Sequence, residues 1–160
     1  VTLLKGLKCI HDTGYTHRDI KPENIMINKR FEVKYIDLGF AAPIERSHHN
    51  KVCGTPYYIA PESANGVFTE KSDLFSLGMV FLMMATKCTN YLIDESSSES
   101  EIIDDIARGT LKPYIEGTFS APVKSLITKM TLFNASFRPT DEQALQEAEN
   151  MKVTFPIHHF

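Results

Sequence analysis

Two short acidic motifs, separated by a stretch that predicts a β-hairpin, constrain the fold of this chain more than any other feature. The first motif is His-Arg-Asp-Ile-Lys-Pro-Glu-Asn at residues 17–24, and the second is Asp-Leu-Gly at residues 37–39. Between them, residues 25–27 and 31–36 are rich in β-branched and aromatic side chains, and Asn-Lys-Arg separates the two runs. A hairpin here would place both acidic loops on one small rigid element.

The remainder of the chain is predicted to be mainly helical. Apolar residues recur at helical spacing in residues 1–12, and Gly14 follows at the position where a left-handed residue would end the helix. Four further stretches show helical patterns: residues 71–86, about 100–108, 121–131 and 140–151. The last opens with Thr-Asp-Glu-Gln, a capping-box signature, whereas the acidic, serine-rich residues 94–101 are expected to form a solvated loop. The fold class predicted is α+β, mainly α-helical.

Composition narrows the classes of partner and the cellular location. The 160 residues carry a net charge of −3 with acidic and basic residues interspersed, so no nucleic-acid partner is predicted. The longest apolar stretch, residues 74–85, is shorter than the ~20 residues of a membrane span. Cys9, Cys53 and Cys88 show neither the spacing of a disulfide framework nor that of metal ligands. We therefore expect an intracellular, cytoplasmic protein without a membrane span.

Three more motifs follow the acidic pair: Gly-Thr-Pro-Tyr-Tyr-Ile-Ala-Pro-Glu at residues 54–62, Ser-Asp-Leu-Phe-Ser-Leu-Gly at residues 72–78 and Arg-Pro-Thr at residues 138–140. In this order, the motifs resemble those of the eukaryotic protein kinase family, in the C-terminal lobe of a serine/threonine kinase domain. The resemblance spans residues 9 to about 145. It implies one partial kinase domain over residues 1–160, with ATP and Mg²⁺ as cofactors and a protein bearing a Ser or Thr acceptor as substrate.

The resemblance also implies roles for the polar residues of the two acidic motifs. Asp19 corresponds to the catalytic base that accepts the proton of the substrate hydroxyl, and Lys21 to the lysine that pairs with the transferred phosphate. Asn24 and Asp37 correspond to the magnesium ligands, and an amide oxygen with a carboxylate suits this hard ion. Glu23 takes a position that faces the ATP ribose or a basic residue of the substrate.

Other residues take positions that the family uses for binding or architecture. Met26 lies where an apolar residue contacts the adenine, and Thr55 where a hydroxyl bridges the catalytic base and the lysine. Glu62 and Arg138 are expected to form a buried structural ion pair. Asp73 is expected to anchor the backbone of the catalytic loop from the buried helix.

The segment that begins at the magnesium motif departs from the family pattern. Leu38 replaces the phenylalanine of that motif and retains an apolar side chain. Residues 48–53, where the family carries an activating phosphate, contain no hydroxyl, and only Ser47 remains just upstream. Arg18, which binds that phosphate in the family, is expected either to lack this partner or to bind phosphorylated Ser47.

The family's other nucleotide-binding motifs are not found before the catalytic loop. A Gly-rich loop, a strand lysine and its partner glutamate are all missing, so we expect the N-terminal lobe to be absent from this chain. The expected partner is that lobe or a longer parent chain, and the surface that meets it should expose apolar side chains. We expect little or no catalysis from the isolated chain. The alternative is a non-catalytic, lobe-only binding module or a pseudokinase-like scaffold.

Overall fold

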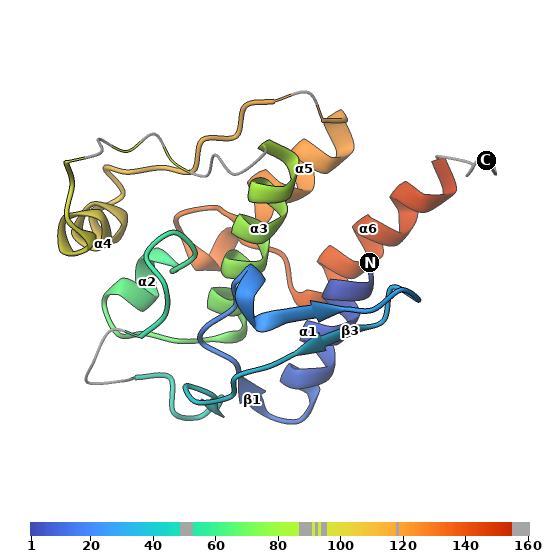
Figure 1. Cartoon of the computed structure of the whole chain (residues 1–160), viewed down its shortest axis with the longest axis horizontal. Coiled ribbons are helices and arrows are strands. Elements are labelled where there is room, and N and C mark those ends of the chain that lie inside the picture. Colours follow the sequence, from blue (N-terminus) through green and yellow to red (C-terminus); the bar gives the residue numbers. More distant parts are fainter. Residues whose placement is uncertain (49–52, 87–90, 92, 94–95, 118, 155–160) are drawn as a thin grey trace.

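Helix α3 (Glu70–Thr86) lies at the centre of the molecule, and the other elements surround it (Figure 1). The structure is a computed structural model that describes residues 1–48, 53–86, 91, 93, 96–117 and 119–154. Cys88 and residues 94–95 of the acidic, serine-rich stretch lie outside this part of the chain. Within it, helices combine with two small antiparallel sheets, which agrees with the predicted α+β class.

Helices make up most of the described fold. Besides α3, the α-helices are α1 (Thr2–Asp12), α2 (Pro61–Ala64), α4 (Glu99–Arg108), α5 (Ala121–Met130) and α6 (Asp141–Thr154). Short 3₁₀ turns occupy Pro22–Asn24 and Ala135–Phe137. The predicted helices are confirmed, with ends that differ by at most three residues. Helix α2 was not predicted, because a single turn is too short to show a helical period.

Two small antiparallel sheets flank the loops that carry the acidic motifs. Strand β2 (Ile25–Ile27) pairs with β3 (Val33–Tyr35), and this pair is the predicted hairpin. Strand β1 (Tyr15–Thr16) pairs with β4 (Ala42–Pro43) and was not predicted. The second pairing brings the stretch after the Asp-Leu-Gly motif back beside the residues that enter the catalytic loop.

The turn of the hairpin is longer than the predicted Asn-Lys-Arg loop. Asn28 Oδ1 accepts hydrogen bonds from the backbone amides of Arg30 and Glu32, at 2.9 and 3.0 Å. Phe31 adopts a left-handed φ of 60°. Because Asn side chains close turns of this kind, β3 begins at Val33 and not at Phe31 as predicted.

The core forms around the middle of α3, which is mostly apolar and mostly buried. Five of its side chains are at most 1% exposed: Leu74, Phe75, Leu77, Met79 and Leu82. Helices α1, α5 and α6 pack against it. At Gly78 a Cβ atom would lie 2.9 Å from side-chain atoms of both Met130 and Thr131, so the close approach of α3 to the end of α5 requires glycine.

Capping boxes begin two of the helices that surround α3. The predicted one precedes α6, where Thr140 N donates to Gln143 Oε1 at 2.9 Å and Gln143 N donates to Thr140 Oγ1 at 3.2 Å. A second one precedes α4, where Ser98 N donates to Glu101 Oε2 at 2.8 Å and Glu101 N donates to Ser98 Oγ at 3.3 Å. The expectation of a loop over all of residues 94–101 is therefore wrong at its end, because the Ser98 cap starts a helix at Glu99.

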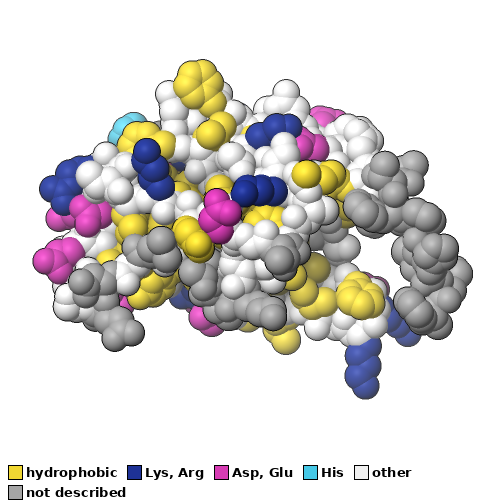
Figure 2. Space-filling model, turned by 90° about the horizontal axis from the view of Figure 1, so that it is seen from above, with side chains coloured by type: hydrophobic (Ala, Val, Ile, Leu, Met, Phe, Trp, Pro, Cys, Tyr) yellow, Lys and Arg dark blue, Asp and Glu magenta, His cyan; other side chains and the backbone are white. Residues whose placement is uncertain are grey.

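Charged side chains of both signs are interspersed with apolar ones on the face of the molecule shown in Figure 2. Among the described residues, no helix is both long enough and apolar enough to cross a membrane.

Candidate active site

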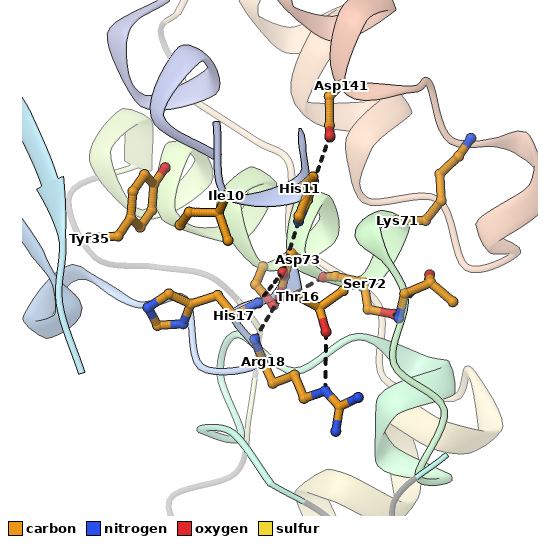
Figure 3. A network of polar contacts seen from close by, with 12 residues as sticks. Ile10, His11, Thr16, His17, Arg18, Tyr35, Lys71, Ser72, Asp73 and Asp141 are labelled. Carbon is orange, nitrogen blue, oxygen red and sulfur yellow. Dashed lines mark hydrogen bonds and ion pairs between the residues drawn. The ribbon is translucent and has the colours of Figure 1, made fainter. Parts of the chain in front are cut away.

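The loop of residues 17–24, which carries the first acidic motif, is attached to the core through Asp73, in the first turn of α3. The backbone amides of His17 and Arg18 donate to its two carboxylate oxygens, at 2.7 and 2.8 Å (Figure 3). Asp73 is 2% exposed, and Arg18 has a left-handed φ of 71°, which is uncommon outside glycine. The buried carboxylate therefore stabilises a strained turn just before Asp19.

A buried histidine extends this network to α6. His11 of α1 lies between two carboxylates, with Nε2 2.9 Å from Asp73 Oδ2 and Nδ1 2.6 Å from Asp141 Oδ2 (Figure 3). Burial alone would lower the pKa of His11, but the hydrogen bonds to Asp141 and Asp73, and their charges, raise it to about 9. At neutral pH the imidazolium thus donates to both carboxylates.

Asp19, Lys21 and Thr55 form a compact polar cluster at the catalytic loop. Lys21 Nζ donates to Thr55 Oγ1 at 2.9 Å and lies 3.2 Å from Asp19 Oδ2. Thr55 Oγ1 donates in turn to Asp19 Oδ1 at 3.2 Å. The hydroxyl therefore connects the carboxylate and the ammonium, although Thr55 lies 36 positions after Asp19 in the chain.

Asn24 fixes the other side of Asp19. Its Nδ2 donates to the Asp19 backbone carbonyl at 2.8 Å and to Asp19 Oδ2 at 3.0 Å. Because the amide nitrogen faces Asp19, the amide oxygen is the atom that a cation would contact. The Asn24 carbonyl accepts a hydrogen bond from Ile36 N at 2.9 Å, which ties this loop to the residue before Asp37.

Asp37 lies in an exposed turn two residues after β3 ends. It has a left-handed φ of 58°, and its Oδ1 accepts a hydrogen bond from Gly39 N at 3.2 Å. Among the described residues, no three His, Cys, Asp or Glu side chains group together as a metal site. Asn24 and Asp37 nevertheless fit Mg²⁺, since this ion typically takes one or two protein oxygens and completes its shell with waters and substrate phosphates.

Glu23 and Met26 lie beside this cluster without joining it. Glu23 is in the exposed part of the 3₁₀ turn Pro22–Asn24, and Met26 of β2 is 58% exposed, opposite Lys34 in the hairpin. Both side chains are therefore accessible to a ligand bound over the hairpin.

The guanidinium of Arg18 is held by protein groups. It lies 5.0 Å from the centre of the Phe68 ring, Nε donates to Thr16 Oγ1 at 3.2 Å, and Nη2 donates to the Arg46 carbonyl oxygen. Ser47 lies next to this contact, with Oγ 3.1 Å from His48 Nδ1 and its carbonyl oxygen accepting from Phe68 N. Arg18 thus has partners without a phosphate.

The ion pair expected between Glu62 and Arg138 is present and bidentate. Arg138 Nη1 lies 2.6 Å from Glu62 Oε1, and Nη2 lies 2.8 Å from Oε2. The Arg138 side chain is fully buried, and its guanidinium lies 4.8 Å from the centre of the Phe75 ring. Ser72 Oγ also donates to Glu62 Oε1, at 2.8 Å. The pair fastens α2 to the segment that precedes α6.

The sequence matches a family model described as the protein kinase domain over residues 1–148. The chain belongs to the protein kinase family. Members of this family are transferases that generally use ATP and Mg²⁺.

Known protein kinases and one kinase relative named as inactive are similar to this chain. It is 36% identical over 155 residues to the serine/threonine-protein kinase cds1 of Schizosaccharomyces pombe, covering 90% of this chain and 33% of that protein. It is 30% identical over 157 residues to calcium-dependent protein kinase 4 of Plasmodium falciparum, covering 90% and 28%. It is 35% identical over 150 residues to the inactive serine/threonine-protein kinase PLK5 of Mus musculus, covering 91% and 24%. The chain thus spans 24–33% of the length of these relatives.

This kinase chain exposes apolar side chains around the hairpin and the magnesium motif. Tyr15, Met26, Leu38 and Phe40 are between 46% and 61% exposed. A hollow of about 630 Å³ is lined in part by Cys9, Tyr15 and Leu38. Apolar side chains are also exposed elsewhere, among them Met84, Phe133 and Phe137.

Sequence reasoning did not identify His11 or Asp141 as members of the kinase site. Both lie in helices that were predicted, but 130 positions separate them in the chain. One signal was available, because His11 lies four residues after Leu7 on the apolar face of α1. A titratable residue on a buried face requires a polar partner.

Proposed function

We propose that this chain is the C-terminal lobe of a serine/threonine kinase and supplies the catalytic loop of a longer protein that transfers the γ-phosphate of ATP to Ser or Thr hydroxyls. The observation that carries the proposal is the cluster of Asp19, Lys21 and Thr55, in which one hydroxyl connects the carboxylate and the ammonium. This arrangement places a proton acceptor beside a fixed positive charge, as phosphoryl transfer to a hydroxyl requires.

In this proposal Asp19 accepts the proton of the acceptor hydroxyl. Its Oδ1 accepts from Thr55, and its Oδ2 from Asn24, so the carboxylate is held in one orientation before substrate binds. Lys21, 3.2 Å from Asp19 Oδ2, places its charge where negative charge develops on the transferred phosphate. A Lys at this position supports Ser or Thr acceptors.

Asn24 and Asp37 would hold Mg²⁺ through an amide oxygen and a carboxylate oxygen. The ion would neutralise charge on the ATP phosphates. Met26, exposed on β2, supplies an apolar contact for the adenine, and Glu23 faces the ribose or a basic residue of the substrate.

We propose that the catalytic lobe acts together with an N-terminal lobe in a longer parent chain. The exposed side chains of Met26, on the hairpin, and of Leu38 and Phe40, in the segment that follows it, support this, because exposed apolar surface commonly marks an interaction site. The chain covers only 24–33% of the lengths of its relatives, and this also supports a longer parent chain. The free thiols of Cys9 and Cys53 fit an intracellular, cytoplasmic location.

The contacts of Arg18 allow two ways in which this residue could take part in regulating the kinase. Either its contacts with Thr16, Arg46 and Phe68 replace the phosphate that the family uses, or phosphorylated Ser47 competes for the guanidinium. The present contacts favour the first arrangement, since they already use the side chain.

A non-catalytic scaffold is the second candidate function. The observation that favours it is the similarity to mouse PLK5, a relative whose name describes it as inactive. In that case the same fold would bind a partner through its exposed apolar surface without transferring phosphate.

Phosphorylation of a Ser/Thr peptide with ATP and Mg²⁺ separates the two candidates. The assay compares the isolated chain with a protein that includes the upstream coding sequence. We expect activity in the longer protein only, reduced by a factor of about 10² to 10⁴ by Asp19→Ala and abolished by Asp37→Ala. Asp104→Ala, which removes an exposed carboxylate of α4, is the matched control and should leave activity unchanged. Activity absent from the longer protein, or unaffected by Asp19→Ala, would favour the scaffold.

A further inference from the structure

Polar contacts between three helices connect the start of α6 to the loop of residues 17–24. Asp141 is the first residue of α6, His11 lies in the last turn of α1, and Asp73 lies in the first turn of α3. His11 Nδ1 donates to Asp141 Oδ2 at 2.6 Å, and Nε2 donates to Asp73 Oδ2 at 2.9 Å (Figure 3). Asp141 is therefore two hydrogen bonds away from the carboxylate that holds the loop.

One oxygen of Asp73 serves both the histidine and the loop. Asp73 Oδ2 accepts from the backbone amide of His17 at 2.7 Å and also from His11 Nε2, while Oδ1 accepts from the amide of Arg18 at 2.8 Å. Because two donors share Oδ2, a change at His11 alters the hydrogen bond to His17, and rotation of the planar carboxylate carries the change to Arg18. Asp19 comes next in the chain, and a small displacement of a catalytic group has a large effect on rate.

The His11 ring satisfies both carboxylates only while it carries two protons. A neutral imidazole has one N–H donor and one lone pair, so one of its nitrogens would face a carboxylate oxygen with no proton between them. The Asp73 side chain is 3% exposed and that of Asp141 is 15% exposed, so water has little access to either. Loss of one proton from His11 must therefore displace the ring or one of the two carboxylates.

Other titratable groups near His11 or on the elements around it have different contacts. Tyr35 of β3 donates to the Leu3 carbonyl at 2.8 Å, and burial raises the pKa of its phenol. The hydrogen bond to Asp12 raises the pKa of Lys8, and burial raises that of the Cys53 thiol beside Arg18. The remaining groups either contact other partners or are exposed: Lys5, Tyr15, His17, Lys34, Lys71 and Glu142.

We propose that Asp141 is a positioning residue for the loop of residues 17–24 and acts on it through His11 and Asp73. While His11 carries both protons, Asp141 fixes the ring with Nε2–H on Asp73, and both loop amides keep their acceptor. When His11 loses a proton, this link opens and the hold of Asp73 on the loop changes. The consequence for phosphoryl transfer rests on the proposed kinase function, whereas the consequence for the loop amides does not.

Nuclear magnetic resonance of the chain, recorded from below pH 6.5 to above pH 9, tests the link without any catalysis. The carbon-bound protons of the His11 ring report its ionisation, and the amide signals of His17 and Arg18 report the loop. We expect the three sets of signals to change together, with one midpoint at about pH 9. Loop amides that do not respond as His11 titrates would overturn the proposal.

Three variants separate a positioning role from a merely structural one. Asp141→Asn keeps the size of the side chain and removes its charge, so the shared midpoint should fall by about 1 to 3 pH units. His11→Gln removes the titrating ring, and the transition in the loop amides should disappear. Glu142→Gln, at the next and exposed position of α6, is the control and should leave the midpoint unchanged.

An amide midpoint that stays in place in Asp141→Asn, or an amide transition that persists in His11→Gln, would overturn the proposal. A merely structural role for Asp141 would lower stability without moving the midpoint. Circular dichroism verifies that each variant folds. If Asp141→Asn fails to fold, His11→Gln and the joint titration of the unmodified chain still decide the result.

The pH profile of peptide phosphorylation by the longer protein tests the catalytic consequence. In Asp141→Asn the decline of kcat at alkaline pH should begin about 1 to 3 pH units lower than in the unmodified protein, and Glu142→Gln should leave the profile unchanged. An active protein whose profile is the same in Asp141→Asn would overturn the positioning role. A longer protein without activity would count against the proposed kinase function, and the amide titration would still decide whether Asp141 acts on the loop.

Discussion

At the scale of single residues, the buried imidazole of His11 links the stability of the fold to pH. Its folded-state pKa of about 9 lies above the ordinary value of 6.5. The stabilisation that its charge contributes is therefore complete below pH 6.5 and is lost as the pH rises through about 9. Asp141→Asn removes one of the two carboxylates that raise this pKa. We expect the variant to lower the free energy of unfolding by about 1.5 to 3 kcal/mol below pH 6.5 and by much less above pH 9.

Urea denaturation of both proteins across this pH range measures the difference. Glu142→Gln, a change at the next residue of α6 whose side chain is exposed, is the control and should not alter the pH dependence. A destabilisation by Asp141→Asn that is the same at every pH would contradict the proposed coupling between His11 and Asp141.

At the scale of secondary-structure elements, the start of α4 depends on one serine. Ser98 Oγ accepts from Glu101 N, and Ser98 N donates to the Glu101 carboxylate, so backbone donors of the first turn have partners. Ser98→Ala should lower the free energy of unfolding by about 1 kcal/mol. Ser100→Ala, inside the first turn of the same helix, is the matched control and should be neutral or slightly stabilising. Equal losses in the two variants, measured by urea denaturation, would exclude a role for the cap.

The elements that the sequence predicts well are those specified by local signals. The hairpin follows from β-rich runs on either side of Asn28, and α3 from a long apolar stretch. The polar cluster at Asp19, by contrast, was expected only from the resemblance to the kinase family, because Thr55 lies 36 positions after Asp19. Contacts that depend on tertiary packing were not predictable in this way. The approach of Asp141 to His11 and the isolated phenol of Tyr91 are examples, since no local pattern reports which distant side chain will lie beside a buried group.

At the scale of the whole molecule, two acidic residues, the buried Asp73 and the partly buried Glu62, join segments that are remote in sequence. Asp73 connects α3 to the catalytic loop, and Glu62 connects α2 to Arg138, 76 positions away. Both interactions lie against α3, so the loops of the candidate site are held by the same helix that forms the core. The position of the site and the stability of the fold are consequently coupled.

The Glu62–Arg138 ion pair can be tested for its contribution to the stability of the fold. Glu62→Gln leaves the Arg138 guanidinium charged and fully buried without its carboxylate, and we expect the free energy of unfolding to fall by about 3 kcal/mol or more. Glu147→Gln breaks the pair between Lys129 and Glu147, which has a similar distance of 2.9 Å but lies at the surface, and should cost less than about 1 kcal/mol. Urea denaturation of the two variants measures both losses. Similar small losses would mean that the buried pair does not stabilise the fold, because desolvation of its two charges would then cancel their attraction.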